Sequence, residues 1–240
     1  MKRMLLSLLA LFLYQSVAMA ISTADFTNQA DIFLGKYVEY GNVAYSKIKQ
    51  NKAEIDQLYQ MIADVDLSKA SDAEKKAFYI NAYNLIVIHH IVEYYPLKSA
   101  LDKNGFFDQL KHRVAGESLT LDQIEKGKVI IKYRDPRVHF AFSCAAKGCP
   151  KLAGFAYRAD KLDEQLDRRT RQVVQDLKFT WFDLDNRVVY ISKIFDWYER
   201  DFTQDGKTVV EWINQYRNKE IPRHFSVVHY DYDWSLNELI

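Results

Sequence analysis

Residues 138–152 read VHFAFSCAAKGCPKL and contain both cysteines of the chain, Cys144 and Cys149. The first six residues alternate in type, which predicts a β-strand with its large apolar side chains facing the core. His139, Ala141 and Ser143 would then share the opposite, smaller and more polar face. We expect this strand to organise the rest of the domain and to carry the functional site.

The strand should end in a tight turn at CAAKGCP, residues 144–150. Gly148 can adopt a positive φ, and Pro150 fixes its own φ and lacks a backbone donor. A turn at this point brings His139, at the start of the strand, toward the thiols at its end. We therefore expect a site formed by an imidazole and a sulfur.

The first twenty residues, MKRMLLSLLALFLYQSVAMA, have the pattern of a cleaved secretory signal: Lys2 and Arg3, an apolar run at 4–13, and a small-x-small exit. The apolar run is short for a bilayer span, and no cysteine stands near the exit. We expect a periplasmic or secreted protein with no stable membrane insertion after cleavage.

Composition describes the remaining chain as one globular unit. The full sequence is 48% hydrophobic, and without Lys2 and Arg3 its 31 basic and 32 acidic side chains nearly cancel. Such a balance provides no field to attract nucleic acid or anionic lipid. Because no linker, repeat or low-complexity tract interrupts residues 21–240, we predict a single domain there.

Apolar spacing predicts helices over residues 23–35 and 54–65. A capping box at Ser71 and Glu74 opens a longer helix that Pro96 stops. This helix is apolar nearly all round, so it should be the central buried one. Asn81 and Asn84 lie on one face of it, and buried amides need hydrogen-bond partners.

The second half of the chain mixes helices and strands. A capping box at Thr120 and Gln123 predicts a short helix that Gly127 ends, followed by a strand at 129–133. A charged amphipathic helix, with Leu177 on its buried side, should span 160–177, and a hairpin should join 180–183 to 187–192. Two further helices and a strand at 225–230 follow. The pattern predicts an α+β fold: a helix-rich single domain around a small, mostly antiparallel sheet.

Five phrases of the sequence carry a resemblance to a known family. They are YINAYN (79–84), SLTLDQIEKG (118–127), DPRVHFAFSCAAKGCPKL (135–152), ISKIFDWYERDF (191–202) and YDYDWSLN (230–237). In this content and order the chain resembles the domain-of-unknown-function family 547, found in exported bacterial proteins and at the carboxyl end of plant leucine-zipper proteins. The resemblance implies no activity. One proline follows Cys149 where members commonly have two, and the zipper is absent, so we expect a monomer.

One hypothesis makes Cys149 a nucleophile. A helical turn starting at Pro150 would lower the pKa of the preceding thiol, and His139 would take its proton. Asn81 or Asn84 would orient the imidazole or stabilise an oxyanion. These residues would make a thiol-dependent hydrolase or acyltransferase, although papain-like enzymes place the cysteine before the histidine.

A second hypothesis is a disulfide between Cys144 and Cys149, whose separation across a turn suits the roughly 4.4–6.8 Å that bonded Cα atoms require. So short a loop gains less than the roughly 3 kcal/mol of a fifteen-residue loop, so the bond would shape the turn more than hold the fold. A non-catalytic binding module or envelope-associated module would then use the groove beside the bond for a small molecule or peptide.

Other interpretations receive less support from the residue pattern. Cys144, Cys149 and His139 offer zinc-type ligands, but without a second ligand pair we predict no metal and no cofactor. Arg137, Ser143 and Cys144 are the expected substrate contacts, and Arg137 could instead pair with Asp135 or Glu125.

Two aromatic segments and a histidine pair complete the candidate residues. Trp197, Tyr198, Tyr232 and Trp234 could line a cleft or belong to the core. Of the adjacent His89 and His90, one is expected to be a hydrogen-bonded core residue.

Overall fold

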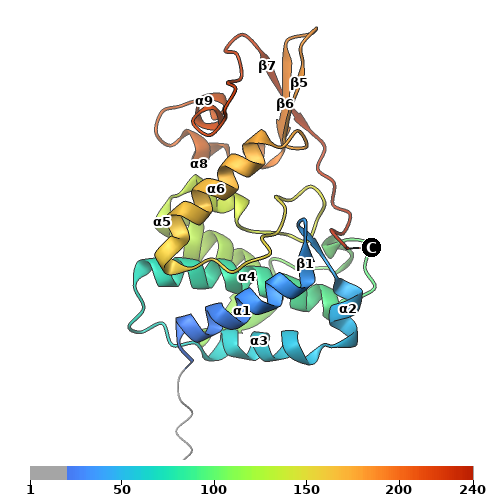
Figure 1. Cartoon of the computed structure of the whole chain (residues 1–240), viewed down its shortest axis with the longest axis vertical. Coiled ribbons are helices and arrows are strands. Elements are labelled where there is room, and N and C mark those ends of the chain that lie inside the picture. Colours follow the sequence, from blue (N-terminus) through green and yellow to red (C-terminus); the bar gives the residue numbers. More distant parts are fainter. Residues whose placement is uncertain (1–20, 240) are drawn as a thin grey trace, which may run out of the picture.

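Four helices form the base of the molecule, with α4 in its centre (Figure 1). The computed structural model describes residues 21–239, so the predicted signal at 1–20 lies outside the described residues. The four are α1 (Thr23–Tyr37), α2 (Tyr45–Gln50), α3 (Ala53–Asp64) and α4 (Asp72–Tyr94). The helices predicted at 23–35, at 54–65 and before Pro96 are confirmed.

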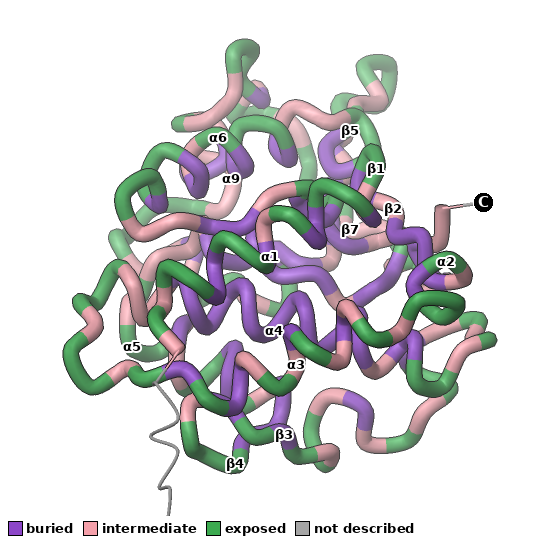
Figure 2. The backbone as a smooth tube through the Cα atoms, turned by 60° about the horizontal axis from the view of Figure 1, so that its bottom comes forward, coloured by how far each residue is buried: buried purple, intermediate pink, exposed green. Residues whose placement is uncertain are grey.

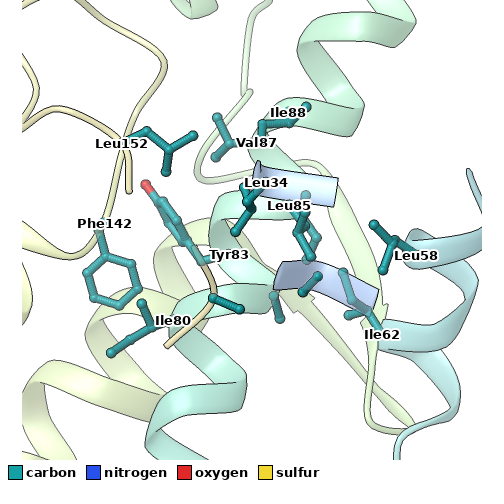
Figure 3. Packing of buried hydrophobic residues seen from close by; sticks show 14 of the residues in the cluster. Leu34, Leu58, Ile62, Ile80, Tyr83, Leu85, Val87, Ile88, Phe142 and Leu152 are labelled. Atoms are coloured by element: carbon teal, nitrogen blue, oxygen red, sulfur yellow. The ribbon is translucent and has the colours of Figure 1, made fainter. Parts of the chain in front are cut away.

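Helix α4 begins where its capping box predicts. The Ser71 hydroxyl accepts from the Glu74 backbone N–H, and the Glu74 carboxylate accepts from the Ser71 N–H. From Ala77 to His89 every residue is buried, and Figure 2 shows α4 as the most continuously buried part of the chain. Around Tyr83, Figure 3 shows the side chains of α4 packed beside Phe142 and Leu152. The central buried helix is therefore confirmed.

The strands form three small sheets. Two are hairpins, β1 (Val38–Glu39) with β2 (Asn42–Val43) and β3 (Lys111–Val114) with β4 (Glu117–Thr120). The third has the order β5 (Thr180–Asp183), β6 (Val188–Ser192) and β7 (Ser226–Tyr230), with β5–β6 antiparallel and β6–β7 parallel. The predicted α+β class is confirmed, with the strands divided among three sheets.

Short helical segments connect these sheets and carry much of the site. They are η1 (Ala100–Asp102), η2 (Gln123–Ile130), α5 (Ile131–Tyr133), η3 (Pro136–Phe140), η4 (Ala159–Lys161), α6 (Leu162–Gln175), α7 (Ile194–Trp197), α8 (Glu199–Thr203) and α9 (Val209–Asn214). Helix α6 and the helices α8 and α9 stand above the base with the third sheet (Figure 1). Leu177, predicted on the buried side of α6, lies beyond its end and is 69% exposed.

The predicted strand at 138–143 is wrong: the structure has the 3₁₀-helix η3 and an irregular segment there. The Asp135 carboxylate accepts from the Arg137 N–H, and Pro136 supplies a helical φ at the first position, so a helical turn starts immediately before the apolar residues. All six residues are buried. Phe140 packs in one core cluster, and Val138 and Phe142 pack in the other, so there is no solvent face that alternation could reflect.

The predicted strand at 129–133 is also wrong. The Thr120–Gln123 capping box is present, but the helix does not end at Gly127 and continues through η2 and α5. Its wide turns bring Ile124 and Val129, five residues apart, to one buried side. Burial of both side chains explains why the helix passes through the glycine.

Candidate functional site

A cavity of about 290 Å³ lies where η2, η3 and the loop 144–149 meet the C-terminal segment, residues 231–239. Its walls are mainly aromatic, with one buried acid and both cysteine sulfurs. The residues on which the site depends are Tyr83, Glu125, His139, Phe142, Cys144, Cys149, Trp197, Tyr198, Tyr232 and Trp234. The structure thus brings His139 and the two cysteines together, although not by the strand that the sequence predicted.

The sulfur atoms of Cys144 and Cys149 lie at disulfide distance, with their Cα atoms 6.3 Å apart. The backbone N–H of Cys144 donates to the sulfur of Cys149 over 2.9 Å. The Tyr232 hydroxyl lies 3.0 Å from the Cys149 sulfur and 3.2 Å from that of Cys144. The disulfide alternative for this pair is thereby supported, and the bond forms one wall of the cavity.

The turn between the cysteines differs from its prediction. The positive φ lies at Ala145 (61°) and not at Gly148. Gly148 is needed for another reason: a Cβ there would come within 3.0 Å of the Asp233 backbone N and of the Tyr232 ring. The glycine lets the C-terminal segment lie directly against the cysteine loop.

His139 is held by an acidic partner and an aromatic ring. Its Nε2 is 2.8 Å from Asp201 Oδ2 on α8, and its ring stacks on Tyr198 with centroids 4.0 Å apart. Nδ1 is buried and has no hydrogen-bond partner within the described residues. The Asp201 contact fixes the orientation of the imidazole and leaves one ring nitrogen without a partner.

Glu125 is the buried acid of the cavity, 9% exposed on η2. Burial raises the pKa of its carboxyl, and this effect exceeds the opposing influence of His139 and of the Tyr198 hydroxyl. That hydroxyl donates to Glu125 Oε1 over 3.0 Å. A carboxyl with a raised pKa keeps its proton to higher pH and can then donate a hydrogen bond to a ligand.

The aromatic side chains of two segments distant in sequence meet at the cavity. Trp197, after β6, packs against Tyr232 and Trp234 of the C-terminal segment, with centroids 4.9 and 6.0 Å apart. Burial raises the pKa of the Tyr232 phenol, so it stays a neutral donor near the sulfurs. Of the two interpretations of these aromatic residues, the cleft is the one that their position supports.

Asn81 and Asn84 are not among the residues that line the cavity. The Asn81 amide donates to the Tyr157 carbonyl and accepts from the Tyr157 N–H. Asn84 donates to the Ala141 carbonyl and accepts from the Ser143 N–H. Both side chains therefore fix loops onto α4, and the segment that Asn84 holds leads directly into Cys144.

Arg137 and Ser143 also lie outside the cavity lining. Arg137 pairs with Asp135 at 3.0 Å and with Asp163 at 2.7 Å, which is the structural alternative for this residue. The Ser143 hydroxyl is buried. Of the three expected substrate contacts, Cys144 alone is among the cavity residues.

Sequence patterns alone did not identify Glu125 and Asp201 as site residues. Each lies in a phrase that carries the family resemblance, Glu125 in 118–127 and Asp201 in 191–202. A glutamate on a helix and an aspartate in a charged segment are ordinarily solvated, so residue type gives no signal. Membership in those phrases was the signal available.

A second cluster of histidines lies near the C-terminal end of α4. His89 is 3.0 Å from Asp56 and stacks on Tyr59, whose hydroxyl is 3.0 Å from His112 Nδ1. His90 and His112 have ring centroids 4.4 Å apart. Burial lowers the pKa of His90 to about 4 and that of His112 to about 3.

Two findings concern metals and membranes. Among residues 21–239, no group of three or more His, Cys, Asp or Glu side chains is arranged to hold a metal ion. Over the same residues, no helix combines the length and apolar character needed to cross a bilayer.

Comparison with known proteins identifies one family. The model described as "Protein of unknown function, DUF547" matches residues 67–174, which include α4, Glu125, His139 and both cysteines. Neither the search of curated proteins nor that of solved structures returned a match. The predicted resemblance is confirmed over residues 67–174, where the chain matches the model of the DUF547 family of proteins of unknown function.

Proposed function

We propose that this chain is an exported binding domain whose cavity holds a small molecule or a peptide side chain with an aromatic body and a hydrogen-bond acceptor. The observation that carries the proposal is the cavity itself: aromatic rings on several sides, a bonded cysteine pair as one wall, and a single buried acid. Apolar walls with a few placed polar groups are typical of small-ligand sites.

Glu125 gives the proposal its polar specificity. Because burial raises the pKa of this carboxyl, the acid is protonated, and able to donate to a carbonyl or ether oxygen of the ligand, up to a higher pH than an exposed glutamate. Trp197 and Trp234 supply flat apolar surface for the ligand's ring. A ligand with an aromatic ring and one acceptor would satisfy both features.

The test uses acetophenone, which has a ring and a carbonyl, with ethylbenzene as the probe that lacks the acceptor. The chain has four tryptophans, and their indole N–H signals can be followed by NMR. Acetophenone should shift the signals of Trp197 and Trp234. Trp181 on β5 and Trp212 in the second core cluster are internal controls.

Variants at Glu125 separate the acceptor contact from simple apolar binding. Glu125→Leu should weaken acetophenone binding about fivefold, the value of one hydrogen bond, and leave ethylbenzene unaffected. Glu125→Gln keeps a donor and should bind nearly normally. Equal shifts of all four indole signals, or none, would refute the proposed cavity function.

A second candidate is the thiol-dependent hydrolase or acyltransferase, which needs Cys149 as a free thiol in the native protein. The favouring observation is that His139 and Cys149 line the same cavity, with a backbone donor aimed at the Cys149 sulfur. Asn81 and Asn84 would serve it only by holding loops. A thiol titration of the native protein without reductant separates the candidates: no reactive thiol favours the binding domain, and two favour the hydrolase.

A further inference from the structure

The Cys144–Cys149 disulfide is asymmetric in its surroundings. Both residues line the cavity, but Cys144 is partly exposed whereas Cys149 is only 6% exposed. The backbone N–H of Cys144 donates to the Cys149 sulfur over 2.9 Å. A sulfur that already accepts a hydrogen bond is the better leaving group, because the donor stabilises the thiolate that forms.

The loop that holds the cysteines does not depend on the bond between them. The N–H groups of Lys147 and Gly148 donate to the carbonyls of Ser235 and Asp233, each over 2.8 Å, and the N–H of Asn237 donates to Ala145. The bond closes a separation of only five residues, so opening it returns little chain entropy. The donor aimed at Cys149 should therefore stay in place after reduction.

We propose that the Cys144–Cys149 pair is a thiol–disulfide exchange site for low-molecular-weight thiols, with Cys144 as the attacked sulfur and Cys149 as the leaving thiolate. The thiol reaches the sulfurs through the cavity. The proposal is independent of whether the cavity also binds an aromatic ligand.

The exchange proceeds in two balanced steps. A thiolate RS⁻ attacks the Cys144 sulfur; an RS–S bond forms, the protein S–S bond breaks, and Cys149 keeps the electron pair. A second RS⁻ attacks the R sulfur of this mixed disulfide and releases RSSR and the Cys144 thiolate. Two thiols are oxidised, the protein disulfide is reduced, and the two protons lost by RSH are taken up by the cysteines.

The Tyr232 hydroxyl contributes to leaving-group stabilisation. It lies 3.0 Å from the Cys149 sulfur, and burial raises the pKa of the phenol, so it remains a proton donor at the pH of exchange. Together with the Cys144 N–H it would give the Cys149 thiolate two donors within a largely aromatic environment. Without these donors, that environment would raise the thiol pKa.

The direct experiment traps the mixed disulfide on the unmodified protein. The native chain is treated with limiting 2-mercaptoethanol, quenched with N-ethylmaleimide in acid, and digested for peptide mass spectrometry. The expected product carries 2-mercaptoethanol on Cys144 and maleimide on Cys149. An adduct mainly on Cys149, an even distribution, or reaction only in denaturant would overturn the proposal.

A second measurement tests the role of the phenol. Tyr232→Phe should slow reduction by 2-mercaptoethanol about fivefold, the effect of one lost hydrogen bond. In the Cys144→Ser background, which leaves Cys149 as the single thiol, Tyr232→Phe should raise the thiol pKa. Tyr190→Phe, on the outer sheet beside Trp181, is the matched control and should change neither quantity. An unchanged rate and pKa in Tyr232→Phe would remove the phenol from the mechanism.

Discussion

Two regions beside α4 contain buried histidines, and only one of these regions lies at the aromatic cavity. His139 lines a cavity that also contains an acid and a disulfide, and its Nδ1 has no hydrogen-bond partner among residues 21–239. The cluster of His89, His90 and His112 lies among Tyr59, Phe106 and the surrounding core, and none of the three is among the residues of the 290 Å³ cavity. Burial of a titratable group therefore does not define a site; an adjoining space for a ligand is also needed.

The largest expected effect concerns the link between α4 and the segment 141–143, which leads to the cavity. Asn84→Leu leaves the Ser143 N–H and the Ala141 carbonyl without their partner, which should cost roughly 2–3 kcal/mol of unfolding free energy. It should also weaken acetophenone binding, because the loosened segment carries Phe142 and Cys144. Urea unfolding and NMR titration measure the two effects. Loss of stability with full retention of binding would show that α4 does not position the cavity.

The histidine cluster should control acid stability. Burial holds the folded pKa of His112 at about 3, below the ordinary histidine value of 6.5, so the unfolded chain takes up its proton first as the pH falls. The stabilisation of the fold by neutral His112 is complete above about pH 6.5 and is lost as the pH falls toward 3. Between pH 7 and pH 5, His112 alone should account for about 2 kcal/mol.

The variant His112→Leu removes the titrating imidazole and so isolates its share of the pH dependence. Its unfolding free energy should vary less with pH than that of the parent chain, while its affinity for acetophenone stays the same at pH 7. Urea titrations at several pH values provide the comparison. An unchanged pH slope would mean that other groups cause the acid sensitivity.

Two glycines give a smaller and oppositely signed pair of effects. Gly148→Ala forces a Cβ against Asp233 and Tyr232 and should destabilise the fold by about 1 kcal/mol or more. Gly127→Ala, in a helix with open space around it, should stabilise by up to about 1 kcal/mol. Thermal unfolding of both variants tests the pair. Stabilisation by Gly148→Ala would show that the C-terminal segment does not lie against the loop.

The smallest effect is expected at Glu125. Burial raises the folded pKa of the Glu125 carboxyl. The protonated carboxyl therefore contributes to the unfolding free energy at low pH, and this contribution is lost as the pH rises through the folded pKa. Glu125→Gln should therefore match the parent chain in acid and become the more stable of the two at neutral and higher pH. Urea unfolding at pH 4 and pH 8 gives the comparison. A variant less stable than the parent at pH 8 would show that the carboxylate is stabilised in the fold.

Local signals predicted much of this fold. The capping boxes at Ser71 and Thr120, the central helix and the 180–192 hairpin follow from short-range chemistry and are confirmed. The strand at 138–143 was wrong because burial on both sides removed the link between alternation and exposure. The strand at 129–133 was wrong for a related reason. Ile124 and Val129 are buried on one side of η2 although they are five residues apart, a spacing that puts two side chains on the same face of neither a strand nor an α-helix.

The site was predictable where its residues are adjacent in sequence and not elsewhere. Cys144, Cys149 and His139 lie within eleven positions of one another, and this proximity in the sequence identified them as candidate site residues. Glu125 and Asp201 come from elements that approach only in the folded chain, and their residue types are common on surfaces. Their role follows from burial and from contact with His139, which are tertiary properties.

The C-terminal segment has a consequence for biosynthesis. The Tyr45 hydroxyl donates to Asn237, 192 residues later, and the same segment brings Tyr232 and Trp234 to the cavity. A nascent chain therefore emerges with its helical base available to form early and its cavity open on one side. Contacts of such separation close late because of their loop entropy. The two cysteines should thus meet the cellular thiol pool before the last residues enclose them.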